Sequence, residues 1–260
     1  MTMSGLDCVQ EPAVAEPGGL RMEPVFAEGG AVGSLMGSVD WPSTAVGPIE
    51  SWPQSLRTSL SICLASRFPT VIYWGDAFTT LYNDGYAAIL GAKHPWALGR
   101  SGREVWSEIW DVIDPMLHGV LRTGIATWSQ DQLLILHRQG FPEECYFTFS
   151  FGPVRVESGQ VGGIYCAVTE TTERILSERR LRTLRALASR TAEATTADDA
   201  CRLAACALGD VDTAADLPFA LLYLLDRDGR VARLTGAAGL APGARFSPTS
   251  VDLRPSSPEL

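Results

Sequence analysis

Two stretches of the sequence decide the fold: VIYWGDAFTTLYNDGY at residues 71–86 and ESGQVGGIYCAVTE at residues 157–170. The first has the pattern of a strand, a Gly-Asp turn, a second strand and an Asn-Asp break that leads into a helix. The second has the pattern of a hairpin turn, a strand and a Thr-Glu exit into a charged helix. These patterns predict an α+β domain whose sheet begins with the first stretch and ends with the second.

The segments between these stretches complete the predicted sheet. In the central segment every second residue from Cys145 to Phe151 is apolar, which predicts a strand with one buried, aromatic face. Three strands are expected in this part of the chain, at 126–136, 145–156 and 161–169.

The composition restricts the class of protein. The chain has 260 residues and a net charge of -9, so no dense basic surface for nucleic acid is expected. No stretch reaches the roughly 18 apolar residues of a membrane span, and the N-terminus lacks the pattern of a secretion signal. The six cysteines include no C-x-x-C pair. This favours reduced thiols, a cytoplasmic location and no metal site.

A set of short motifs carries a family resemblance. These motifs are WPSTAVGP at 41–48, WPQSL at 52–56, LYND at 81–84, GAKHP at 91–95, LGR at 98–100 and EIW at 108–110. With them, residues 50–172 resemble PAS domains over their whole length. The wider arrangement is similar to the N-terminal part of bacterial multi-sensor (PAS-GAF) histidine kinases. The resemblance implies the PAS fold, an antiparallel five-stranded sheet with flanking helices.

The sequence after the sheet resembles a signalling linker helix followed by the start of a GAF domain, with a DRDG hairpin at 226–229. Two departures from the family pattern stand out. Ala167 occupies the position expected for the Asp of the closing Asp-Ile/Val-Thr motif, which removes one contact to the linker. Residues 197–260 are too few for a whole GAF fold, so an incomplete GAF-like α/β segment is expected.

Five parts are therefore expected along the chain. They are a disordered acidic tail at 1–33, a Trp/Pro-rich strap at 34–54, a PAS sensor domain at 55–172, a signalling linker helix at 173–196 and an incomplete GAF-like domain at 197–260.

The resemblance implies regulation, with no chemistry carried out by this chain itself. No histidine has the sequence context of a phosphoacceptor and no Gly-rich nucleotide motif is present, so no catalytic residue is expected. We expect a cytoplasmic sensory and dimerisation module that regulates an output domain, as the N-terminal part of a sensor histidine kinase in a two-component phosphorelay. Two alternatives remain open: a ligand-free protein-interaction module, and a haem- or flavin-binding sensor of redox state, gas or light.

Signal transfer is expected at the end of the last strand of the sheet, through Thr169 and Glu170. In the helix that follows, Leu181, Leu184 and Ala188 step by three and four residues, which predicts a short seam for a homodimer. The expected partners are a second copy of the chain and a downstream kinase or other output domain, with no nucleic acid and no membrane.

A small-molecule pocket is expected between the sheet and its helices, because aromatic residues are dense in these segments. A plain aromatic core explains the same residues equally well. The candidate lining residues are Tyr82, Asn83, Tyr86, Arg100, Trp110, Trp128, Phe147, Phe149 and Tyr165. The sequence does not identify the ligand.

His118 is the candidate for a haem ligand. It falls on a helix that is expected to have Asp114 as its N-cap and Pro115 in its first turn, and to end before Gly124. In haem-binding PAS domains this helix carries the axial histidine, although a surface histidine is the simpler interpretation. The Asn-Cys-Arg-Phe-Leu-Gln helix of flavin-adduct PAS domains has no counterpart in the sequence.

Overall fold

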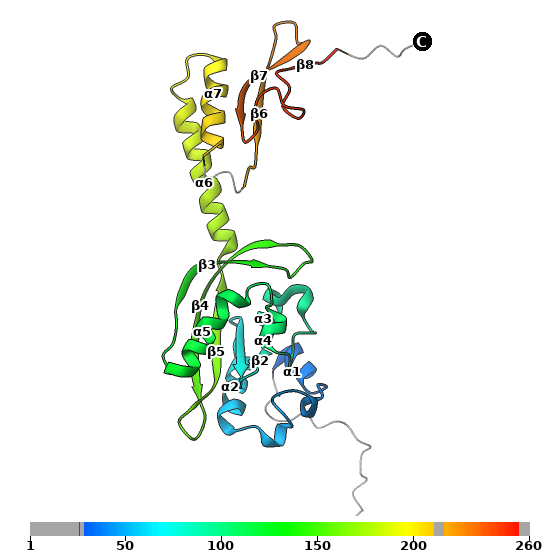
Figure 1. The fold of residues 1–260 in the computed structure, drawn as a ribbon, viewed down its shortest axis with the longest axis vertical. Helices are drawn as coiled ribbons and strands as arrows, with labels where there is room; N and C mark the ends of the chain where they lie inside the picture. Colours follow the sequence, from blue (N-terminus) through cyan, green and yellow to red (C-terminus); the bar gives the residue numbers. More distant parts are fainter. Residues whose placement is uncertain (1–25, 27–28, 211–215, 255–260) are drawn as a thin grey trace, which may run out of the picture. The chain divides into compact units, whose positions relative to one another are not determined.

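The computed structural model describes residue 26, residues 29–210 and residues 216–254 (Figure 1). Most of the predicted tail at 1–33 lies outside these residues. The described end of that tail is folded: Phe26 is 1% exposed, and helix α1 begins at Gly30. The backbone N–H groups of Ala31 and Val32 donate to the carboxylate of Asp84, at 3.0 and 2.7 Å. For residues 29–33, therefore, the prediction of disorder was wrong, because a distant acidic side chain caps this short helix.

The elements follow one another as helices, then a sheet interrupted by helices, then a helical hairpin and a small sheet. In chain order they are α1 (Gly30–Met36), η2 (Trp41–Ser43), η3 (Ile49–Ser51), α2 (Gln54–Ala65), β1 (Thr70–Trp74), β2 (Thr79–Tyr82), α3 (Asp84–Leu90), η4 (Gly91–Lys93), α4 (Gly102–Val105), α5 (Trp110–Thr123), β3 (Ser129–Leu136), β4 (Glu143–Arg155), β5 (Val161–Glu170), α6 (Thr172–Thr191), α7 (Ala197–Leu208), β6 (Ala220–Leu225), β7 (Val231–Ala238) and β8 (Ser250–Asp252).

The chain divides into two compact units. The first contains α1 to α5 and most of the five-stranded sheet. The second contains everything from Glu170 onward, together with residues 131–133 of β3 and 144–147 of β4. The beginning of α6 therefore belongs to the same unit as short stretches of two sheet strands.

The large sheet has the strand order β2-β1-β5-β4-β3. β1 pairs antiparallel with β2 from Val71↔Tyr82 to Trp74↔Thr79, and on its other edge with β5. The two stretches that predict the fold thus lie side by side in the sheet. In β4 the alternate residues from Cys145 to Phe151 are buried, which confirms the predicted aromatic face.

The strap at residues 34–54 is compact rather than simply extended. Its two tryptophans, Trp41 and Trp52, pack edge to face with ring centroids 5.0 Å apart, and Phe26 stacks on Trp41 at 6.3 Å. Both indole N–H groups are bound within the segment: that of Trp41 donates to the Met36 carbonyl, and that of Trp52 donates to the Gly47 carbonyl. Because each polar tip is satisfied, the large rings can be buried.

Helix α5 begins at Trp110, four residues earlier than the predicted cap at Asp114. Pro115 therefore lies inside the helix. Its missing N–H leaves the Asp111 carbonyl without the usual partner, but Asp111 and Pro115 are both exposed, so this carbonyl faces solvent. The predicted end is confirmed, since Gly124 adopts a left-handed conformation and its N–H donates to the Val120 carbonyl.

In the second unit, α6 and α7 lie side by side and precede a three-stranded sheet with the order β6-β7-β8 (Figure 1). Gly236 of β7 allows α7 to approach closely, because a Cβ there would lie 2.4 Å from the Cys201 carbonyl oxygen. The predicted hairpin is confirmed: the Asp226 carboxylate accepts hydrogen bonds from the N–H groups of Arg230 and Val231. Across the described ranges, no helix combines the length and apolar character needed to cross a membrane.

Candidate functional site

Asn83 joins three elements in the core of the first unit. Its side-chain oxygen accepts from the N–H groups of Thr70 and Tyr86, both at 3.0 Å, and so caps helix α3. Its amide nitrogen donates to the carbonyls of Cys63, Ser66 and Phe68, at 2.8 to 3.1 Å. Both polar atoms of this predicted pocket residue are thus engaged by backbone, which makes Asn83 a structural centre of the domain.

Three polar groups meet in the core of the first unit, and we call them the core cluster: Tyr73, Tyr86 and Trp106. The two tyrosine hydroxyls are 3.3 Å apart, and burial raises the pKa of both phenols. Trp106 is 2% exposed. Its indole N–H lies close enough to both tyrosine hydroxyls to lower their pKa values, but it makes no well-aligned hydrogen bond within the described part of the chain. A buried donor without an acceptor destabilises a protein by about 1–3 kcal/mol. The core cluster is therefore a group of buried polar side chains whose hydrogen-bonding capacity is not fully used.

Sequence reasoning selects Tyr86 but neither Tyr73 nor Trp106. Tyr73 lies on a five-residue strand whose first four residues are all buried, so its sequence has no alternation to identify the inner face. Tyr73 also packs edge to face on Phe151, with ring centroids 6.2 Å apart. Cys166 lies close enough to contribute to the raised pKa of Tyr73, and burial raises the pKa of its own thiol.

The other predicted pocket residues are dispersed. Tyr82 is fully buried, and its hydroxyl lies 2.9 Å from His94 Nδ1. Arg100 is on the surface, with its guanidinium 4.7 Å from the centre of the Trp96 ring, and Trp128 is 68% exposed. Among the remainder, Phe147 and Phe149 are buried in β4, whereas Trp110 and Tyr165 are half-buried.

His118 lies on the exposed side of α5. Its side chain is 51% exposed, and its Nδ1 atom is 3.0 Å from the Asp114 carboxylate. The Phe78 ring packs edge to face on it, with centroids 5.0 Å apart. An axial haem ligand needs an apolar enclosure that excludes water, and this position does not provide one. The surroundings of His118 do not fit a haem ligand.

The second site is the junction between the sheet and α6. β5 continues to Glu170, and α6 starts at Thr172, so Ala167 lies within the strand and not at the junction. The Thr171 N–H donates to the Tyr146 carbonyl at 2.7 Å, and the Thr172 hydroxyl accepts from the Tyr146 N–H at 2.9 Å. Two consecutive threonines therefore tie the start of α6 to the edge of β4.

Asp131 strengthens the junction from β3. Its carboxylate accepts a hydrogen bond from the Thr171 hydroxyl at 2.8 Å and one from the Arg174 guanidinium at 2.5 Å. Asp131 has a φ of 50°, an uncommon backbone conformation for a residue other than glycine. Arg174 also binds Glu178 one helical turn later, at 3.0 Å. The first turns of α6 are thus held by two strands of the sheet.

Arg179 makes the most extensive ionic contact of the junction that the described residues contain. Its side chain is only 11% exposed and forms paired hydrogen bonds with two carboxylates, those of Glu144 in β4 and of Asp216. These bonds raise the pKa of Arg179 and lower that of Glu144. Paired guanidinium–carboxylate contacts are both strong and directional. We call Arg179, Glu144 and Asp216 the arginine latch.

The predicted dimer seam lies on the surface of α6. Leu181 and Leu184 are 46% and 60% exposed, and Ala188 is also exposed. The predicted signal-transfer residues Thr169 and Glu170 form the exposed end of β5. The positions that the sequence selects for signal transfer therefore flank the hydrogen-bonded residues of the junction. The sequence gives no comparable signal for the arginine latch, whose members are far apart in the chain.

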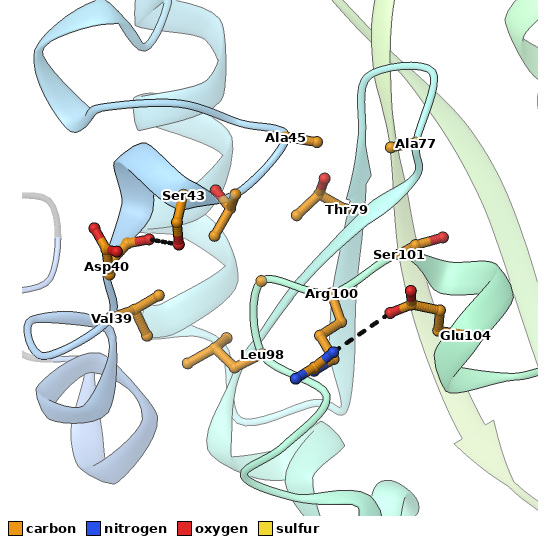
Figure 2. A pocket seen from close by; sticks show the side chains of 12 residues that line it. Val39, Asp40, Ser43, Ala45, Ala77, Thr79, Leu98, Arg100, Ser101 and Glu104 are labelled. Atoms are coloured by element: carbon orange, nitrogen blue, oxygen red, sulfur yellow. Dashed lines mark hydrogen bonds and ion pairs between the residues drawn. The ribbon is translucent and has the colours of Figure 1, made fainter.

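A third feature is a surface pocket of about 370 Å³ in the first unit, which we call the strap pocket (Figure 2). The strap forms one wall, and the loop that leads into α4 forms the other, with Thr79 of β2 beside it. Arg100 belongs to this pocket and lies 3.7 Å from Glu104. No group of three or more potential metal ligands occurs among the described residues.

Comparison with known proteins identifies the fold of the region that contains the five-stranded sheet. A family model described as PAS fold matches residues 66–176. Similar solved structures include a sensory box sensor histidine kinase from Vibrio cholerae, with 18% identity, a TM-score of 0.32 and coverage of 44% of this chain and 86% of that chain. The PAS domain of BvgS from Bordetella pertussis is also similar, with 17% identity and a TM-score of 0.32. The match covers 45% of this chain and 86% of that chain.

The Vibrio cholerae VqmA dimer is a further similar structure, with 16% identity and a TM-score of 0.33. The match covers 41% of this chain and 47% of that chain, so this chain spans about half of VqmA. No curated protein matches the chain. The family match spans all five strands of the large sheet and helices α3 to α5. Residues 66–176 are therefore a PAS-fold domain.

Proposed function

We propose that this chain is a cytoplasmic sensory and dimerisation module in which the PAS domain regulates an output domain through α6. The observation that carries the proposal is the junction, where β5 continues directly into α6 and side chains of β3 and β4 hold its first turns. A movement of the sheet would change these contacts and so shift α6 between two positions.

Binding of a ligand in the core of the PAS domain would cause that movement of the sheet. The indole N–H of Trp106, which makes no well-aligned hydrogen bond, and the adjacent tyrosine hydroxyls favour a small molecule that carries a carbonyl oxygen or a ring nitrogen as acceptor. Because Tyr73 belongs to β1, which pairs with β5, a ligand at the core cluster would act on the strand that leads into α6. The core cluster and the junction thus form one proposed route.

Replacement of Trp106 by Phe tests the sensing step. This change removes the indole N–H and keeps an aromatic ring, so we expect the ligand-free protein to lose less than about 1.5 kcal/mol of unfolding free energy. The amount of small molecule that co-purifies, measured by native mass spectrometry, should fall by about ten-fold. A parent protein that carries no small molecule would instead support the ligand-free interaction module. A visible chromophore in the purified protein would support the haem or flavin alternative.

The seam on α6 is proposed to join two copies of the chain. Leu184→Asp places a charge in the middle of this exposed apolar row and should convert a dimer to a monomer, as measured by light scattering. Arg185→Asp is the matched control, since it introduces the same side chain at the next, also exposed, position of the helix. A dimer that survives Leu184→Asp, or that is lost equally with Arg185→Asp, would contradict the seam.

The output domain is proposed to be a histidine kinase of a two-component phosphorelay, with α7 and the β6-β7-β8 sheet as the start of a GAF-like domain. The proposal rests on the sequence resemblance and on the order of the elements. The test is the intact mass of the native polypeptide that carries this sequence in its source cells. A kinase predicts a mass well above 28.0 kDa and ATP-dependent phosphorylation of a histidine. A native mass of 28.0 kDa would overturn the kinase assignment and leave the sensory role intact.

A further inference from the structure

The strap pocket has two chemically different walls. The domain wall carries hydrogen-bond donors: the Arg100 guanidinium and the hydroxyls of Thr79 and Ser101 (Figure 2). An isolated bridge pairs Thr79 with Ser101, so their side chains are presented next to each other. Within the described residues, the Arg100 side chain has one ionic neighbour, Glu104 at 3.7 Å, and no shorter hydrogen bond. Most of its donors are therefore available to a ligand.

The strap wall carries an acidic group. Asp40 is exposed, and its carboxylate has no ionic partner among the described residues. The nearby hydroxyls of Ser43 and Thr44 are already used, because they donate to the carbonyls of Asp40 and Trp41 at 2.8 and 2.7 Å. The strap wall thus offers a carboxylate and the domain wall offers a guanidinium, with Glu104 beside it as a second carboxylate.

The pocket is preformed, because the strap is anchored next to it. Gly99 has a φ of 75°, and a Cβ at this position would lie 3.3 Å from Thr44 and 3.5 Å from the Trp41 ring. The loop backbone therefore lies directly against the strap. Trp41 is 1% exposed and fixes the strap through its aromatic contacts. A volume of about 370 Å³ is at the lower end of the range for ligand pockets, which suits a compact molecule.

We propose that the strap pocket binds a small zwitterion of the α-amino acid class. The ligand carboxylate would accept hydrogen bonds from Arg100 and from the hydroxyls of Thr79 and Ser101. The ligand ammonium group would face Asp40 on the strap wall. Such a molecule would join the strap to the domain, so the pocket is a second binding site, distinct from the core cluster. This inference stands independently of the proposed role of α6.

Calorimetric titration of the chain tests the proposal with defined probes. L-Alanine and L-glutamine are the zwitterions, and acetate and ethylamine carry only one of the two charges. We expect saturable binding of at least one amino acid, and binding at least about ten-fold weaker for both single-charge probes. Arg100→Gln and Asp40→Asn should each weaken amino acid binding about ten-fold. The control Arg103→Gln, which removes an exposed arginine outside the pocket lining, should leave it unchanged.

Three results would overturn the inference. They are acetate binding as tightly as the amino acids, no saturable heat from either amino acid, and equal weakening by Arg103→Gln and Arg100→Gln. None of them affects the proposed function, because the tests of the core cluster and the seam use other residues and other readouts.

Discussion

The PAS domain is attached at its two ends by different kinds of contact. At the N-terminal end, buried rings form the centre of the strap, with Trp41, Trp52 and Phe26 in mutual contact, and the Trp41 ring lies against Gly99 of the domain. At the C-terminal end, the beginning of α6 is held by charged and hydroxyl groups, above all Arg179 and Asp131. Both ends are connected covalently to the same domain, yet buried rings predominate at one end and charged and hydroxyl groups at the other.

The difference indicates which end is able to move. Buried aromatic surface has to be exposed to water before the strap can leave, at a cost of roughly 25 cal/mol per Å². Charged hydrogen bonds can exchange one partner for another, or for water, at much smaller net cost. The strap is thus suited to completing the domain permanently, and the junction is suited to adopting alternative arrangements.

Trp41→Ala should have the largest effect on this comparison. Removal of a ring that is 1% exposed leaves a cavity beneath the strap, and the unfolding free energy should fall by about 3–5 kcal/mol. Chemical denaturation measures the change. Trp96→Ala is the control, because that ring is 49% exposed and its loss should cost under about 1 kcal/mol. Equal losses in the two variants would show that the strap is not held by buried rings.

Arg179→Met should have the next largest effect. It leaves the carboxylates of Glu144 and Asp216 without their partner, and we expect a loss of about 2–3 kcal/mol, since all three side chains are less than a third exposed. Hydrogen exchange should become faster in the first turns of α6. Arg179→Lys keeps the charge but not the paired geometry, so it should lie between Met and the parent. If Lys behaves like the parent, charge alone holds the latch. If Lys is as destabilised as Met, the paired geometry of the guanidinium is essential.

Gly99→Ala measures how tightly the strap packs against the loop that contains Gly99. The left-handed backbone and the close approach of Thr44 should together reduce stability by about 2 kcal/mol. Gly75→Ala is a matched control, because Gly75 also has a positive φ, of 66°, but has no atom within 4 Å of the added Cβ. The difference between the two midpoints isolates the contact with the strap. Equal midpoints for the two variants would mean that the strap can move away from the added methyl group without loss of stability.

The smallest effect concerns pH and Glu144. Hydrogen bonds from Arg179 lower the pKa of this carboxyl, so ionised Glu144 stabilises the folded state at neutral pH. That stabilisation is lost as the pH falls through the lowered pKa of the folded state, which lies below the ordinary value of about 4.3. Thermal unfolding from about pH 7 to about pH 3 should therefore be less pH-dependent for Glu144→Gln than for the parent. The exposed Glu173→Gln should leave the profile unchanged.

The local pattern of residues predicted most of the sheet correctly. Alternation in β4 and the turn signals around β1, β2 and β5 are short-range features, and a single sequence contains them in full. Helix α5 was misplaced at its start because a proline inside a helix is tolerated where the freed carbonyl faces solvent, and exposure is a property of the tertiary fold.

The sites were harder to predict than the fold. Arg179 meets Glu144 and Asp216 across 35 and 37 positions of the chain, and no spacing rule connects such residues. Asn83 was selected as a pocket residue because it is polar within an aromatic region, but the structure uses both its polar atoms to join backbone segments. Residues that act through distant partners become recognisable only when the partners are placed.

The two threonines at the junction also fix the rotational phase of α6. Thr171 and Thr172 bind the backbone of Tyr146, so the rotational position of the first turn of α6 is fixed against the adjoining residues of β4. Each residue turns an α-helix by about 100°. One residue inserted after Thr172 would rotate Leu181 and Leu184 by that angle, whereas seven inserted residues would return them almost to the original direction. The length of α6 between the junction and its apolar row can therefore change only by a number of residues close to whole helical turns, such as seven, eleven or eighteen, if the row is to keep its orientation.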